Sequence, residues 1–313
     1  MPTRVGHDLT ARLDDRPSGR CVALAEALGT VSHDRLTRRR QGDWSGHTRL
    51  DGACRTLCIW ERGVLLLDDT VLPQPLATAR EGLAGVFSSQ ERRPGYGFSL
   101  VLLVGTAGSL RVPLGVRRWH QGGPSKEALA FAWLRPARHH WPGRAASVLV
   151  AAGYPSKARR KRRRDDGWSG GGRLTTHRRC HGHAVRHEPR HPDWTARGWL
   201  SGGLKVLVGS YGATYDATKR LTPSAAEVRR LSRRRAPIAE VIRVCNDHRA
   251  FTGCQARSER AQRQHVAGCL VAVCVLAQQR HAPQLRIYQL KQQLSCQGYS
   301  LALPTLERLR DAA

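Results

Sequence analysis

The sequence predicts an α/β protein: a mixed sheet flanked by helices, with a helical N-terminal region and a β-rich insertion. Short apolar runs bounded by glycine or polar residues recur between residues 63 and 150, with a helical pattern among them. Strand-like segments with glycine turns follow from residue 171, and helical apolar periodicity begins after residue 222. Strands followed by a helix and a further strand are typical of a mixed α/β sheet.

The chain divides into four expected segments. The first is helical and basic, with a short apolar helix at Val22–Leu28 and an arginine run at residues 38–40. The boundaries we expect are residues 1–60 for this region, 61–170 for the first part of the α/β domain, 171–222 for the β-rich insertion and 223–313 for the helical C-terminal part.

Four apolar runs are the expected strands of the main sheet. They are Val64–Leu67, Leu100–Val104, Leu110–Leu114 and Ser147–Val150. Runs of this length bounded by turn residues are typical of buried strands. The segment Lys126–Leu134, which precedes the fourth run, has a helical pattern.

The β-rich insertion contains a hairpin signal. Residues Trp199–Val208 hold two strand-like pieces around Gly202 and Gly203, and a Gly-Gly pair is a favoured hairpin turn. Tyr211–Leu221 supplies a further expected strand.

The chain after residue 222 predicts helices. Ser224–Glu227 matches a capping box, which marks a helix start. Pro237 interrupts the following apolar stripe, so a second helix is expected over Ile238–Val244, packed near the end of the first strand. Arg260–Gln279 predicts a long helix whose second half lies in the core, and Ile287–Leu294 a last one.

The charge of the chain indicates a polyanionic partner. There are 52 Lys and Arg residues against 24 Asp and Glu, giving a formal net charge of +28 and a pI near 11.2. Such a balance favours nucleic acid. The candidate phosphate contacts are Arg159, Arg160, Arg162, Arg163, Arg229, Arg230, Arg233, Arg234 and Arg235. The alternative is a solvated basic face.

Asp68 and Asp69 directly follow the first apolar strand. A carboxylate pair at a strand end, in a chain built to attract polyanions, indicates a metal site for phosphodiester chemistry. The alternative is a strand followed by a polar turn.

Other features restrict the class of protein. No secretory leader is visible at the N-terminus, and the longest apolar window, Val266–Ala277, is too short to span a bilayer. The nine cysteines form no compact framework, so reduced thiols in an intracellular protein are expected. Glycines 170–172 lack the Lys-Ser/Thr of a phosphate-binding loop.

A histidine cluster leaves a zinc site open. Its members are Cys180, His181, His183, His187 and His191. His183, His187 and His191 have helical spacing, as zinc ligands can have. Pro189 and Pro192 argue against a regular helix there.

The order of these segments resembles the DDE transposases of bacterial insertion sequences, which have an RNase H-like catalytic domain interrupted by a β insertion. The resemblance covers most of the chain from about residue 40. It is carried by Leu67–Leu72, Gly108–Gly115, Gly122–Lys126, Tyr154–Lys157, Gly198–Val208, Ala225–Leu231 and Thr252–Ser258. It implies an RNase H-like fold, Mg²⁺ or Mn²⁺ as cofactor, and transposon ends and target DNA as partners. It also implies a bacterial, cytoplasmic, nucleoid-associated location and leaves open a homodimer.

The resemblance also implies a catalytic triad of two Asp and one Glu. The first Asp corresponds to Asp68, with Asp69 beside it. The second should follow Val150, where this chain has Ala151. The family's helix signature falls on Ser232, Arg235, Ala239 and Asn246, so its Glu is replaced by Ala239.

Glu240, one residue further, is the remaining catalytic and metal-ligand candidate with Asp68, although one step turns a helix by about 100°. Basic Arg159 and Arg160 replace an apolar helix face, and glycines 170–172 occupy an expected strand. The resemblance therefore implies a transposase with a degenerate active site, impaired in strand cleavage and transfer. The alternative function is a non-catalytic basic protein that binds DNA or RNA.

Overall fold

The computed structural model describes most of the chain between residues 21 and 278. The described residues are 21–22, 25, 32–42, 64–75, 77, 79–88, 92–108, 110–140, 147–150, 169–191, 193–200, 204–211, 213–218, 224–247, 251, 253–254 and 256–278. The basic run 157–164, the expected helix Ile287–Leu294 and Ala151 lie outside these residues.

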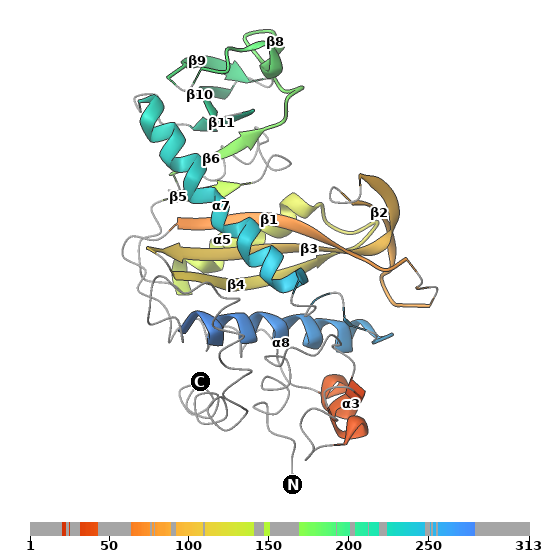
Figure 1. Ribbon diagram of the computed structural model, residues 1–313. Helices are drawn as coiled ribbons and strands as arrows, with labels where there is room; N and C mark the ends of the chain where they lie inside the picture. The colour runs from red at the N-terminus through yellow and green to blue at the C-terminus, as the bar shows by residue number, and fades with distance from the viewer. Residues whose placement is uncertain are drawn as a thin grey trace.

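The described strands form one mixed sheet (Figure 1). Its main part runs β2-β3-β1-β5-β6. The strand β4 pairs with β3 on the edge that faces away from β1. These strands are β1 (Val64–Pro73), β2 (Ala84–Ser88), β3 (Arg93–Ala107), β4 (Leu110–Trp119), β5 (Ser147–Val150) and β6 (Ser169–Leu174). The four predicted strands therefore share one sheet, which confirms the α/β fold class.

Both neighbours of β1 matter for the candidate site. β3 pairs with β1 antiparallel and opposes Leu102 to Asp68, whereas β5 runs parallel to β1 with Val150 opposite Leu67. β6 continues the sheet parallel to β5. The runs are apolar because both faces of this part of the sheet are covered by helices.

The sheet continues into the β-rich insertion. Antiparallel pairs join β6, β11, β10, β9 and β7, with β8 at the edge. The bounds are β7 (Arg179–Cys180), β8 (His183–Ala184), the 3-10 turn η1 (Val185–His187), β9 (Thr195–Leu200), β10 (Leu204–Tyr211) and β11 (Thr214–Thr218). The predicted hairpin is confirmed by the pairing of Leu200 with Leu204. A second, smaller core around Tyr215 and Val206 supports this part.

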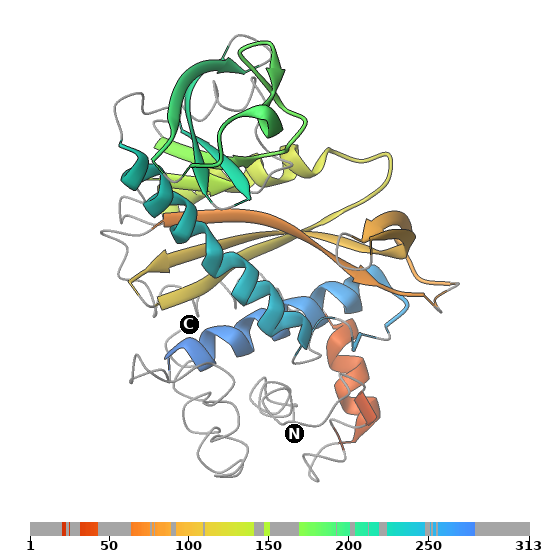
Figure 2. The ribbon, with the colours of Figure 1, turned by 45° about the horizontal axis from the view of Figure 1, so that its top comes forward.

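Helices cover both faces of the sheet (Figures 1 and 2). α5 (Lys126–His140) packs on β3 and β4, α7 (Ala225–Asp247) crosses the opposite face, and α8 (Glu259–Gln278) lies along β4. α3 (His33–Gln41) packs against α8 and represents the predicted helical N-terminal region. Cysteines 180, 245, 254, 269 and 274 are buried, and the described cysteines form no disulfide.

α7 corrects one prediction, because it continues through Pro237 as a single helix of 23 residues. A proline inside a helix costs about 3 kcal/mol through the lost hydrogen bond and the clash with the preceding turn. The helix is held by its packing: Ile238, Val241 and Cys245 on its C-terminal half are buried in the core. As predicted, this half packs against β1.

Glycines 170–172 correct another prediction, because they do not interrupt the sheet. They form the middle of β6, between β5 and β11. A Cβ on Gly172 would lie 2.5 Å from Val150 Cγ2 and 3.1 Å from the Val150 carbonyl oxygen. The glycine is therefore needed for close approach of the two strands, rather than a sign of a lost strand.

Replacing Gly172 with alanine is expected to destabilise the fold by about 1–3 kcal/mol, the usual range for overpacking in a core. Val150 is fully buried and cannot move away from the added methyl group. The matched control is Gly95→Ala, where nothing lies within 4 Å of the added Cβ. Urea denaturation of both variants measures the difference; equal midpoints would contradict the close approach.

Candidate active site

Asp68 and Asp69 lie in the middle of β1, which corrects the prediction that they follow the strand, because β1 continues to Pro73. They lie on opposite faces of the sheet, because side chains alternate along a strand. Asp68 shares its face with Thr70, whose hydroxyl accepts a hydrogen bond of 3.5 Å from Asn246 Nδ2 on α7. Asp69 Oδ2 lies 2.5 Å from Lys126 Nζ, at the start of α5 on the other face. The two carboxylates therefore do not serve one site.

Asp68 lies in a mostly desolvated position under α7. Burial, the largest effect, raises the pKa of its carboxyl to about 6. The Asp69 backbone N–H, which donates to Asp68 Oδ1 at 2.9 Å, opposes this rise, and the charge of Asp69 adds to it. The guanidinium groups of Arg235 on α7 and Arg173 on β6 also lower the pKa, so both lie within electrostatic reach.

Glu240 does not face Asp68. Its carboxylate forms an ion pair with Arg111 of β4. Arg111 is opposite Thr106, which is opposite Val64, so it lies two strands and four residues from Asp68. Ideal strand spacings put the Cα atoms of Arg111 and Asp68 roughly 16 Å apart. The structure thus keeps Asp68 and Glu240 on the same face without bringing their carboxylates together.

Three positions of the helix signature face the sheet near Asp68. Asn246 donates to Thr70, Arg235 lies within electrostatic reach of Asp68, and Ser232 is buried against Asp216 of β11. Its hydroxyl donates a hydrogen bond to the Asp216 carboxylate. Ala239 is in helical phase with Arg235 and Asn246, whereas Glu240 is about 100° further round the helix. Arg235 and Asn246 therefore act on the Asp68 side of α7, whereas Glu240 pairs with Arg111.

Sequence reasoning missed the charged groups contributed by the insertion. Arg173 is the cross-strand partner of buried Asp216 and also acts on Asp68. The only local signal for Arg173 was its place directly after the glycine run, and nothing in the sequence around Asp216 marked it.

The residues around Asp68 do not fit a two-metal centre. Two dications need several converging carboxylate oxygens. Here the guanidiniums of Arg173 and Arg235 lie within electrostatic reach of Asp68, and Glu240 and Asp69 are each paired with another cation. Within the described part of the chain, no three His, Cys, Asp or Glu side chains are placed to hold a metal ion.

The histidine cluster of the insertion, which belongs to the described residues, likewise does not bring three such side chains together. Cys180 is buried in β7, where burial raises the pKa of its thiol. His183 Nε2 lies 2.8 Å from Glu188 Oε1, and the rings of His181 and His183 stack at 6.4 Å. These contacts account for the cluster by local packing.

The arginines of α7 differ in their surroundings. Arg229 pairs with Asp193 at 2.8 Å, and that hydrogen bond lowers the pKa of Asp193; Arg230 pairs with Glu227 at 3.4 Å. Arg233 and Arg234 are exposed, and no described residue forms a hydrogen bond or ion pair with them. Arg235 turns inward. The candidates Arg159, Arg160, Arg162 and Arg163 lie outside the described residues.

No helix in the described part of the chain has the length and apolar character needed to cross a membrane.

Comparison with known proteins supports the fold. No family model and no curated protein sequence matches the chain. Several solved structures do, among them the piggyBac transposase in a synaptic complex with hairpin DNA. That structure has 11% sequence identity and a TM-score of 0.55, with 98% of this chain and 73% of that chain covered. The chain therefore has a fold similar to that of a DNA transposase.

Proposed function

We propose that this chain is a DNA transposase by descent that binds DNA and has lost two-metal strand cleavage and transfer. The observation that carries the proposal is the position of Asp68. It lies on β1, between β3 and β5 and beneath α7, with the helix signature register facing it. The fold similarity to a transposase bound to DNA and the net charge of +28 support the same class.

The finer parts of the proposal rest on the resemblance stated above. They are an insertion-sequence origin, transposon ends and target DNA as ligands, a homodimer and a bacterial nucleoid-associated location. The four-segment division is also a proposal, and β6 crosses its boundary at residues 170 and 171. Mg²⁺ or Mn²⁺ stays the expected cofactor of the ancestral reaction.

The alternative function, a non-catalytic basic protein that binds DNA or RNA, is favoured by one observation. Asp68 lies within electrostatic reach of the guanidiniums of Arg173 and Arg235, as in a structural ion network. A transposase by descent and a non-catalytic basic protein are both expected to bind DNA, and they differ in ancestry. Terminal inverted repeats flanking the gene would identify the transposase origin; their absence around intact neighbouring genes would favour the alternative.

DNA binding is expected to depend steeply on salt and little on sequence, because it releases counterions from phosphates. Each lost phosphate contact lowers the slope of log K against log salt by about 0.9. Changing Arg233 and Arg234 to glutamine should therefore flatten the slope by about two. These two are chosen because, among the described residues, no acid neutralises them.

Fluorescence anisotropy of a labelled duplex between low and moderate salt measures this slope. The matched control is Arg92→Gln with Arg93→Gln, which removes the same charge at the β2–β3 end of the sheet, far from the N-terminal half of α7 (Figure 1). A binding constant that barely changes with salt would refute DNA binding as proposed. Equal slopes for both double variants would place the contact elsewhere.

A further inference from the structure

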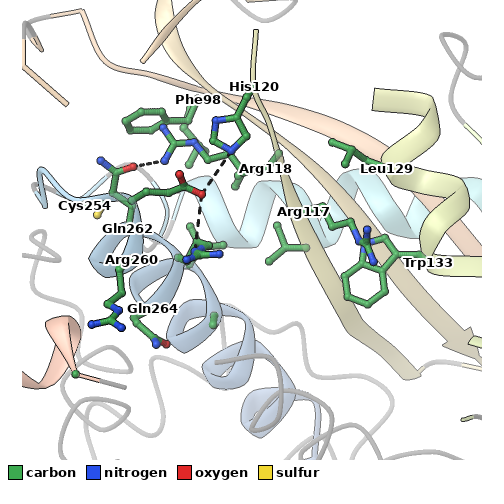
Figure 3. Close-up of a pocket in the computed structure, with 18 residues that line it drawn as sticks. Phe98, Arg117, Arg118, His120, Leu129, Trp133, Cys254, Arg260, Gln262 and Gln264 are labelled. Atoms are coloured by element: carbon green, nitrogen blue, oxygen red, sulfur yellow. Dashed lines mark hydrogen bonds and ion pairs between the residues drawn. The ribbon is translucent and has the colours of Figure 1, made fainter. Parts of the chain in front are cut away.

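A cavity of about 810 Å³ lies beside β4, between α5 and the first half of α8 (Figure 3). Its apolar lining lies on the α8 face of the sheet and includes Leu72, Leu100, Val116 and Val266. Cavities of this size in proteins accommodate small organic ligands. Neither Asp68 nor Glu240 lines it, so it is separate from the candidate active site.

One wall pairs an aromatic ring with a cation. The Arg117 guanidinium lies 4.7 Å from the centre of the Trp133 ring. Burial lowers the pKa of Arg117, and no described residue offers it a hydrogen bond or a carboxylate. Gly115 lets the indole lie against the backbone of β4, since a Cβ there would be 2.5 Å from the ring. A partly desolvated cation without an anion is unfavourable until an anion arrives.

The part of the cavity on the other face of β4, beside α8, is also cationic. Arg118 stacks on Phe98 at 4.0 Å and hydrogen-bonds Gln262, while its Nε is buried without a partner (Figure 3). Arg260 and Arg263 line the same wall.

Glu259 is the one acid among the described lining residues, and it is already shared by His120 at 3.5 Å and Arg263 at 3.8 Å. The cavity is therefore short of negative charge.

We propose that this cavity binds a nucleotide, with the base against Trp133 and the phosphate at Arg117. Aromatic stacking and arginine–phosphate contacts are the chemistry that recognises nucleotides. An apolar ligand would leave Arg117 uncompensated, and an inorganic anion would not stack on the Trp133 ring. The nucleotide is either unattached or an unpaired terminal residue of a DNA strand; both present the same base and phosphate.

Isothermal titration of the full chain with deoxyadenosine monophosphate tests the proposal. Submillimolar binding is expected, at least tenfold tighter than that of deoxyadenosine or inorganic phosphate alone. Arg117→Gln should weaken it at least tenfold. Trp133→Leu should do the same, and Trp133→Phe should retain most of the affinity. Circular dichroism checks that each variant is folded, and Arg117→Gln tests the proposal even if the Trp133 variants unfold.

Two further experiments distinguish a DNA strand end from an unattached nucleotide, and the cavity from the proposed DNA surface. A duplex with a one-nucleotide overhang that binds more tightly than the blunt duplex, with Arg117→Gln abolishing the difference, identifies a strand end; equal binding identifies the unattached nucleotide. Arg233→Gln with Arg234→Gln should leave mononucleotide binding unchanged, so the result is independent of the proposed DNA surface. Failure to bind the mononucleotide at millimolar concentration, or unchanged binding by Arg117→Gln, overturns the proposal.

Discussion

Replacing Asp68 with asparagine is expected to stabilise the fold at pH 8, by an amount of the order of 3 kcal/mol, and to change it little at pH 4. The pKa of Asp68 rises from 3.8 to about 6 on folding, mainly through burial. A rise of this size disfavours the ionised native state by roughly 3 kcal/mol. Asparagine has the same shape without the charge.

The pH window follows from the direction of the shift. Because the native pKa lies above the unfolded one, the native state retains a proton that the unfolded chain releases between about pH 4 and 6. The contribution of Asp68 to stability therefore falls as the pH rises through this window and is constant above it. The variant lacks this fall, so the difference between the two proteins should grow from pH 4 to pH 6 and then stop growing.

Urea denaturation at pH 4, 5, 6 and 8 measures the effect. The control is Glu240→Gln, which breaks the partly exposed pair with Arg111 and should cost up to about 1 kcal/mol at pH 8, the opposite sign. Parallel stability curves for the Asp68 variant and the unaltered chain, or a less stable variant at pH 8, would contradict the burial of an ionised carboxylate at this position.

The unaltered chain is expected to leave supercoiled and linear DNA uncleaved in Mg²⁺ or Mn²⁺. Ala151 and Ala239 offer no carboxylate at two of the three triad positions that the resemblance implies. Arg173 and Arg235 supply positive charge near Asp68, where a dication would have to compete with them. Ala239→Glu places a carboxylate in helical phase with Arg235 and Asn246, whereas Glu240 is about 100° further round α7.

The combination of Ala151→Asp with Ala239→Glu is therefore the minimum change for any recovery of cleavage. Plasmid nicking measures it, with Ala151→Asn and Ala239→Gln as the matched control of similar size without charge. Mg²⁺-dependent cleavage by the unaltered chain that Asp68→Ala abolishes would refute the proposed loss of activity. It would mean that other acids, such as Asp165 and Asp166, supply the missing oxygens.

The sequence by itself determined four strands of the main sheet and the basic character of the chain. Apolar runs such as Val64–Leu67 and Ser147–Val150 identify buried strands because burial on both faces requires continuous apolar side chains. Net charge is a property of composition, and it indicates the class of partner without any fold. The phase of the α7 signature was also readable, because helical spacing alone places Arg235, Ala239 and Asn246 on one face.

The tertiary structure decided which charges meet. Residue propensities predicted a helix break at Pro237 and a strand break at glycines 170–172, and neither break occurs. The buried packing of α7 overrides the low helix propensity of proline. The close approach of Val150 to Gly172 overrides the low strand propensity of glycine. The pairs Asp69–Lys126 and Glu240–Arg111, and the placing of Arg173 beside Asp68, join residues far apart in the chain. Such partners depend on strand register and helix position, which are set by the whole core and leave no local pattern in the sequence.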